Sequence, residues 1–135
     1  MMRKVGSHFL AVMAASLVLV SGLQTVASGL EGMLEGVLKW VGGILIWLLI
    51  GMLSLPLTLA LRFVAERWFS KPTLPAIFVG VAISIAIIPL LHPAMHPGVS
   101  FSTYPIQLTI IHVVAGALGG WVWLLGEFGG KRVEN

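Results

Sequence analysis

The sequence predicts an all-α integral membrane protein, and three observations lead to that class. Of the 135 residues, 58% are hydrophobic and only 10% are charged, whereas about 25% of the residues in a typical soluble domain are charged. Three stretches, 5–30, 40–61 and 72–126, contain no Asp, Glu, Lys or Arg. A chain this short has little interior in which to hide so much apolar surface, so lipid must surround much of it.

These stretches predict four transmembrane helices that pack as one bundle, in a single domain covering residues 1–135. About 20 apolar residues are needed to cross the hydrocarbon core of a bilayer. Placed on the charge-free stretches, the spans are 8–28, 40–62, 74–91 and 105–126. The proline-rich stretch 92–104 separates the last two spans as a stiff loop, because X-Pro pairs favour extended backbone.

The first segment has two interpretations. It begins with the basic "MMRK", continues with an apolar run, and ends in small residues, with Val26 and Ser28 at the positions expected before a signal-peptide cut. Cleavage would leave three spans with the same orientation. The apolar run continues to Ala27, which is long enough to cross a bilayer, so the sequence favours a retained helix.

Lys and Arg residues predict the orientation, because cytoplasmic ends of spans carry the excess of these residues. With the N-terminus inside, only Lys39 lies outside. The cytoplasmic cations are then Arg3, Lys4, Arg62, Arg67, Lys71, Lys131 and Arg132. We therefore expect a multi-pass protein of the plasma (inner) membrane with both termini cytoplasmic and residues 92–104 outside.

Between the first two spans, Glu31, Glu35 and Lys39 recur every four residues and share one helical face. This spacing predicts a short amphipathic helix on the outer surface that leads into the second span. Within that span, Pro56 removes a backbone donor. It is a candidate hinge, and the alternative is the ordinary kink that proline produces in membrane helices.

The fourth span carries small residues four positions apart, a spacing that lets two helix backbones approach closely. These residues are Ala115, Gly116, Gly119 and Gly120. We expect this face to pack against another helix, within the chain or in a neighbouring protein. Matching pairs of small residues occur in the first span at Ala11 and Ala15, and in the third at Gly80 and Ser84 or Ala82 and Ala86.

His92, Met95 and His96 are candidate metal ligands, because imidazole and thioether groups suit copper and related ions. Prolines follow both histidines, and neither Cys nor a carboxylate lies nearby, so a rigid turn is the favoured interpretation. His112 is a candidate cofactor ligand, and a hydrogen bond across helices is the favoured alternative. His8 sits beside Lys4 at the inner edge and needs only solvation.

No catalytic motif is present, and the spans contain no deep carboxylate of the kind that proton-coupled transporters use. The cations form no basic stripe, which excludes nucleic-acid binding. The leading hypothesis is a non-enzymatic accessory subunit of a larger membrane complex, surrounded by lipid and bound to other subunits or to copies of itself. The alternatives are a small oligomeric transporter or holin-like pore, and a haem- or metal-binding electron-transfer subunit. The sequence favours no cofactor, with haem or copper as the alternatives.

Overall fold

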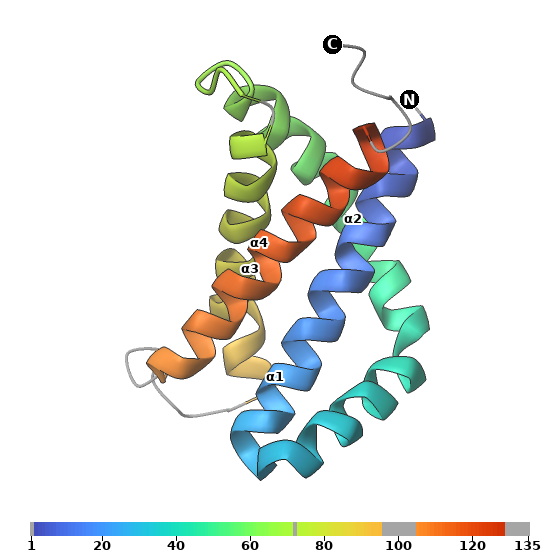
Figure 1. Cartoon of the computed structure of the whole chain (residues 1–135), viewed down its shortest axis with the longest axis vertical. Helices are drawn as coiled ribbons and strands as arrows, with labels where there is room; N and C mark the ends of the chain where they lie inside the picture. The colour runs from blue at the N-terminus through green and yellow to red at the C-terminus, as the bar shows by residue number, and fades with distance from the viewer. Residues whose placement is uncertain (1, 72, 96–104, 129–135) are drawn as a thin grey trace.

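The computed structural model describes residues 2–71, 73–95 and 105–128, with the backbone alone given for 89–95. The described residues form helices and contain no strand. In order, the helices are α1 (Met2–Gly42), α2 (Ile44–Ala65), α3 (Thr73–Met95) and α4 (Ile106–Phe128) (Figure 1). The all-α prediction is therefore confirmed for the described part of the chain.

Three of the helices are long and apolar enough to cross a membrane, namely α1, α2 and α4. Helix α3 is apolar over Thr73–Ile88, the part of it whose side chains are described. It continues through Pro89 and Pro93 to Met95, which is further than the predicted end at residue 91. Residues 92–95 are thus helical, where the sequence predicted a loop.

Gly29 divides α1 into two parts, 2–28 and 30–42. Its φ of 68° and ψ of −154° lie in a region of backbone conformation that is essentially restricted to glycine, because any side chain would be strained there. The chain changes direction at this residue, and the second part of α1 turns back at the lower end of the bundle (Figure 1).

Residues 30–42 form the expected amphipathic helix, but one of its faces packs on the first part of α1. A Cβ atom on Gly36 would lie 2.6 Å from the Cα of Ser21, so only glycine permits this approach. One turn later, Trp40 Nε1 donates a hydrogen bond to Ser16 Oγ over 2.9 Å. The glycine face therefore holds this segment against α1 before the chain enters α2.

Helix α4 lies between α1 and α3 (Figure 1). On one side, a Cβ on Gly119 would come within 3.0 Å of the Cβ of Ala15, and one on Gly126 within 2.6 Å of Ser7 Oγ. These approaches bring the backbones of α1 and α4 close together. Close backbone packing of this kind stabilises helix pairs in lipid, where apolar surfaces gain little from leaving the solvent.

The contact between α3 and α4 is equally close. A Cβ on Gly80 would overlap the carbonyl oxygen of Gly116, and a Cβ on Gly120 would overlap the carbonyl oxygen of Ala76. Helix α2, by contrast, packs more sparsely on its neighbours than α4 does. Helices α1 and α3 therefore pack closely on α4, and helix α2 packs more loosely on the other three.

Candidate functional site

A cavity of about 150 Å³ lies among the four helices. On α1 its lining runs from His8 to Leu19, which is about 16 Å of helix at roughly 1.5 Å of rise per residue. The lining is mostly alkyl side chains and glycine, and none of the described residues that line it is charged. Its polar side chains are His8, Ser16, Ser54, Thr58 and Ser84, together with the indoles of Trp47 and Trp123.

The volume and lining of this cavity suit a small apolar molecule. An engineered apolar cavity of about 150 Å³ in another protein binds benzene or xenon, and the cavity here has a similar volume but is partly open to its surroundings. Here helix α1 contributes Ala11, Val12 and Ala15 to the wall, and α3 contributes Ile83 and Ile87. The cavity can therefore hold one aromatic ring or a short alkyl chain.

His8 lies at one end of the cavity and is only 2% exposed. Its Nε2 is 2.9 Å from the carbonyl oxygen of Gly51 in α2. A carbonyl oxygen can only accept, so the proton is assigned to Nε2. Ser54 Oγ lies 3.2 Å from the same nitrogen. The expectation that His8 is solvated at the membrane edge is wrong, because this contact with α2 buries the ring.

Trp123 of α4 packs edge-on against His8, with 5.3 Å between the ring centroids. The indole is 4% exposed and lines the cavity. Neither its Nε1 nor His8 Nδ1 has a hydrogen-bond partner among the described residues. The cavity thus ends in two buried polar atoms on an otherwise mostly apolar wall.

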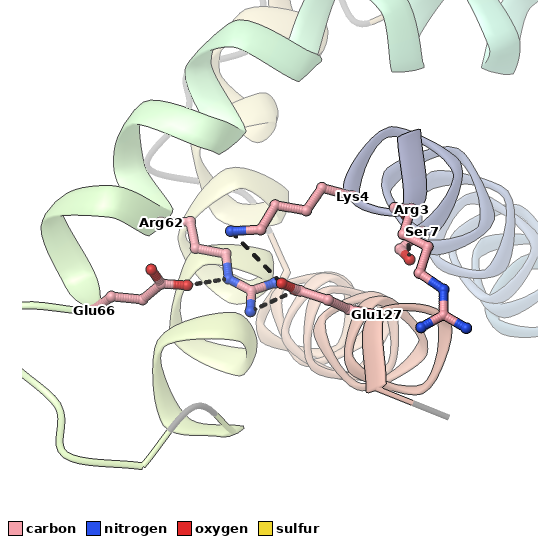
Figure 2. A network of polar contacts seen from close by, with 6 residues as sticks. All are labelled: Arg3, Lys4, Ser7, Arg62, Glu66 and Glu127. Carbon is pink, nitrogen blue, oxygen red and sulfur yellow. Dashed lines mark hydrogen bonds and ion pairs between the residues drawn. The ribbon is translucent and has the colours of Figure 1, made fainter. Parts of the chain in front are cut away.

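Beyond Trp123 lies a group of four charged side chains, shown in Figure 2. Arg62 Nη2 is 2.8 Å from Glu127 Oε2, and Arg62 Nε is 2.9 Å from Glu66 Oε1. Lys4 Nζ is 3.6 Å from Glu127 Oε1. The Arg62 guanidinium also lies over the Trp123 ring, 5.0 Å from its centroid. These contacts bring the start of α1 and the ends of α2 and α4 to the same end of the bundle.

The Arg62 and Glu127 side chains are only 4% and 11% exposed. Removing two charges from water is unfavourable, and a buried pair is tolerated only where each charge compensates the other. The sequence analysis placed Arg62 at the cytoplasmic end of the second span but did not pair it with an acid. The signal was present, since the only acid near the end of the fourth span stands opposite a cation at the end of the second.

The structure places the small residues of the fourth span inside the bundle, where Ala115, Gly116, Gly119 and Gly120 are all buried. Gly119 faces Ala11 and Ala15 of α1, while Gly116 and Gly120 face α3. Helices of the same chain therefore occupy this face. It is not open to another membrane protein.

His112 is also buried, and its Nδ1 lies 3.0 Å from the carbonyl oxygen of Ser84 in α3. The ring thus joins α4 to α3, and it is not part of the cavity lining. Among the described residues, no group of three or more His, Cys, Asp or Glu could hold a metal ion. Of the other candidate ligands, His92 and Met95 fall in α3 where only the backbone is described, and His96 lies outside the described residues.

Pro56 lies on the exposed side of α2, and the helix continues past it from Ile44 to Ala65. Thr58 Oγ1 donates to the carbonyl oxygen of Ser54 over 2.8 Å, and Ser54 Oγ donates to that of Gly51 over 3.3 Å. Hydroxyl groups next to the proline therefore bond to helix carbonyls. A hinge at Pro56 stays a prediction.

No family model, curated protein or solved structure matches this chain. Its function is therefore inferred from its own residues and their geometry.

Proposed function

We propose that this protein is a small, non-enzymatic, multi-pass membrane protein that binds a small, mostly apolar molecule inside its helix bundle. The observation that carries this proposal is the cavity of about 150 Å³, to which all four helices contribute. Its alkyl lining favours apolar ligands, because burying apolar surface is favourable and burying an unpaired charge is not. The ion pair of Arg62 and Glu127 lies beyond Trp123, so neither charge is part of the lining.

The same proposal includes four membrane spans, both termini in the cytoplasm and a location in the plasma (inner) membrane. Two observations support it. Lys4 and Glu127 make an ion pair, so the start of α1 and the end of α4 lie on the same side of the bundle. Seven of the eight Lys and Arg residues fall on that side when the four spans are placed as the sequence predicts.

Single-cysteine labelling tests this orientation, because the chain contains no cysteine of its own. A membrane-impermeant maleimide should label a Ser100→Cys variant in intact cells. It should label a Ser70→Cys variant only after the membrane is opened. Labelling of both variants in intact cells would contradict the orientation, although it would leave the cavity unaffected.

Binding in the cavity is tested by quenching of Trp123 fluorescence with bromobenzene, whose heavy atom quenches an indole only at short range. In a variant that keeps Trp123 as the only tryptophan, we expect quenching that saturates. A second variant that keeps only the exposed Trp121 reports partition of bromobenzene into the detergent micelle and should not saturate.

Matched substitutions in α3 locate the binding. Ile83 lines the cavity, whereas Ile85 on the same helix is exposed and does not. Ile83→Phe should narrow the space and weaken saturable quenching, and Ile85→Phe should leave it unchanged. If Trp123 quenching does not saturate in the parent protein, or if both substitutions act alike, the proposal fails.

A role as an accessory subunit is the second candidate, and the segment 30–42 favours it. Leu30, Leu34 and Leu38 recur every four residues and are all exposed. They lie next to the stripe of Glu31, Glu35 and Lys39, in which Lys39 Nζ pairs with Glu35 Oε1 at 2.7 Å. Large apolar side chains beside charges at the end of a bundle are suited to contact with another protein.

A photo-reactive residue at position 34 tests this candidate, with position 53 on the exposed face of α2 as the matched control. A cross-link to one defined protein from position 34 but not from position 53 would support a subunit role. A cross-link to a second copy of this chain would indicate a homo-oligomer, and lipid adducts alone at both positions would contradict the idea. The pore and electron-transfer alternatives stay hypotheses, since no described feature favours them over these two.

A further inference from the structure

Two buried polar atoms at the end of the cavity lack partners. His8 Nδ1 and Trp123 Nε1 belong to side chains that are 2% and 4% exposed, and both side chains line the cavity. Neither atom has a hydrogen-bond partner among the described residues. Buried polar atoms in folded proteins are nearly always paired, and the exceptions often mark a site for a ligand or an ordered water.

The two atoms have opposite hydrogen-bonding needs. Because His8 Nε2 donates to the carbonyl oxygen of Gly51, Nδ1 carries a lone pair and needs a donor. Trp123 Nε1–H can only donate, so it needs an acceptor. The two rings meet edge to face with their centroids 5.3 Å apart. A hydroxyl group both donates and accepts, so it is the uncharged group that offers each of these two atoms the partner it lacks.

The surroundings also limit the charge of the ligand. None of the described residues that line the cavity is charged. The nearest charged groups, Arg62 and Glu127, neutralise each other at 2.8 Å. An ion in the cavity would therefore lose its hydration without gaining a partner, which is strongly unfavourable.

From these observations we propose that the cavity binds an uncharged molecule that carries one hydroxyl group on an aromatic ring or a short alkyl chain. The hydroxyl donates to His8 Nδ1 and accepts from Trp123 Nε1, and the apolar part extends along Ala11 and Val12, one turn further along α1. This inference rests on the proposed function, because it requires that the cavity binds a small molecule. Hydrogen bonds to neutral partners have modest net strength, so we expect the hydroxyl to strengthen binding by about 3- to 10-fold.

The experiment uses the full chain with Trp123 as its only tryptophan. The other tryptophans are changed to Phe, at positions Trp40, Trp47, Trp68 and Trp121. Three probes are titrated at neutral pH: 4-bromophenol, 4-bromoanisole, which has an oxygen but no hydroxyl proton, and bromobenzene. The variant that keeps only Trp121 corrects for partition into the micelle.

We expect 4-bromophenol to saturate the quenching of Trp123 at about 3- to 10-fold lower corrected concentration than bromobenzene. The anisole should bind more weakly than the phenol because it cannot donate to His8. In a His8→Phe variant, the ratio of the affinity for 4-bromophenol to the affinity for bromobenzene should fall to nearly one, while bromobenzene still binds. Ser7→Ala is the matched control, since it removes a hydroxyl next to His8 that bonds to the carbonyl oxygen of Arg3 and does not line the cavity.

The outcomes separate the two proposals. Equal binding of the three probes to the parent protein overturns recognition of a hydroxyl. A preference that persists in His8→Phe overturns it as well. Absence of saturable quenching by every probe overturns the proposed function itself. If His8→Phe does not fold, the comparison of the three probes in the parent protein still decides.

Discussion

Replacing Glu127 with Gln should destabilise the bundle more than any other single change among its four grouped charges. The Arg62 side chain is 4% exposed, and Glu127 is the carboxylate that pairs with its Nη2 at 2.8 Å. Without that carboxylate, the guanidinium stays buried with Glu66 as its remaining ion-pair partner. Removing one member of a buried ion pair costs about 3–5 kcal/mol in protein mutational studies.

Glu66→Gln is the matched control. It removes an ion pair to the same guanidinium, formed at 2.9 Å, but its own side chain is 40% exposed. Exposed pairs four residues apart on one helix contribute only about 0.3–0.5 kcal/mol, because water screens them. Each variant removes one carboxylate partner of the same guanidinium. We therefore expect Glu127→Gln to lower the free energy of unfolding several-fold more than Glu66→Gln does, because the Glu127 side chain is more deeply buried.

Replacing both members of the buried pair should recover most of the free energy of unfolding that Glu127→Gln loses. The double variant Arg62→Met with Glu127→Leu leaves no unpaired buried charge, and such apolar replacements are often neutral or stabilising by about 1–4 kcal/mol. Lys4 and Glu66 remain, but their side chains are 48% and 40% exposed and can be solvated. The free energy of unfolding is measured by titration with dodecyl sulfate in mixed micelles, with tryptophan fluorescence as the signal.

Two results would refute this reasoning. One is a Glu127→Gln variant within about 1 kcal/mol of the parent protein, the size expected of an exposed pair. The other is a double variant that loses as much stability as the sum of the two single changes, because the penalty would then not come from an uncompensated charge.

Three further predictions concern α1 and α4. Gly29→Ala should cost about 1–3 kcal/mol through backbone strain alone, since no atom lies within 4 Å of the added Cβ. Gly6 also has no atom within 4 Å of an added Cβ but lies in regular helix, so Gly6→Ala should instead stabilise the protein by about 0.5–1 kcal/mol. Equal shifts in unfolding midpoint for the two variants would contradict the strained backbone conformation at Gly29. Gly120→Ala should cost about 1–3 kcal/mol by overlap with the α3 backbone, and an unchanged midpoint would show that the two helices can separate freely. Residues 1–28 should be retained in the mature protein because the part of α1 that packs on α4 lies within residues 2–28. An amino-terminal tag should therefore persist on immunoblots, and its loss from the membrane fraction would contradict this.

The sequence predicted the helices well because their signal is local. The charge-free runs mark chain that must satisfy its backbone hydrogen bonds locally, and helices do this without reference to the rest of the fold. The ends were less certain for the same reason. The prolines predict that the third helix ends before Pro93, yet α3 continues to Met95. Membrane helices accommodate prolines that would end a helix in water.

The candidate site depends on pairings that no local pattern contains. Periodicity assigned Gly116 and Gly119 to one face, but it did not say that Gly119 meets α1 and Gly116 meets α3. The prediction that His8 is solvated was wrong, because it relied on the nearby Lys4, which indicated a position at the water-exposed edge of the membrane. Its spacing from Ala11 and Ala15 was the better signal, since it places the ring on the small-residue face that packs inward.

The way α2 is held links the cavity to the rest of the bundle. Helices α1 and α3 each approach α4 through glycine and alanine backbones, so their distances from α4 are fixed by direct contact. Helix α2 is instead tied to them by side chains, through His8 to Gly51 and Arg62 to Glu127, and Pro56 lies between these two ties. The volume of the cavity therefore depends mainly on where α2 lies. Because His8 is bonded to α2 by Nε2 and faces the cavity, a ligand that binds Nδ1 acts on the same side chain that positions this wall.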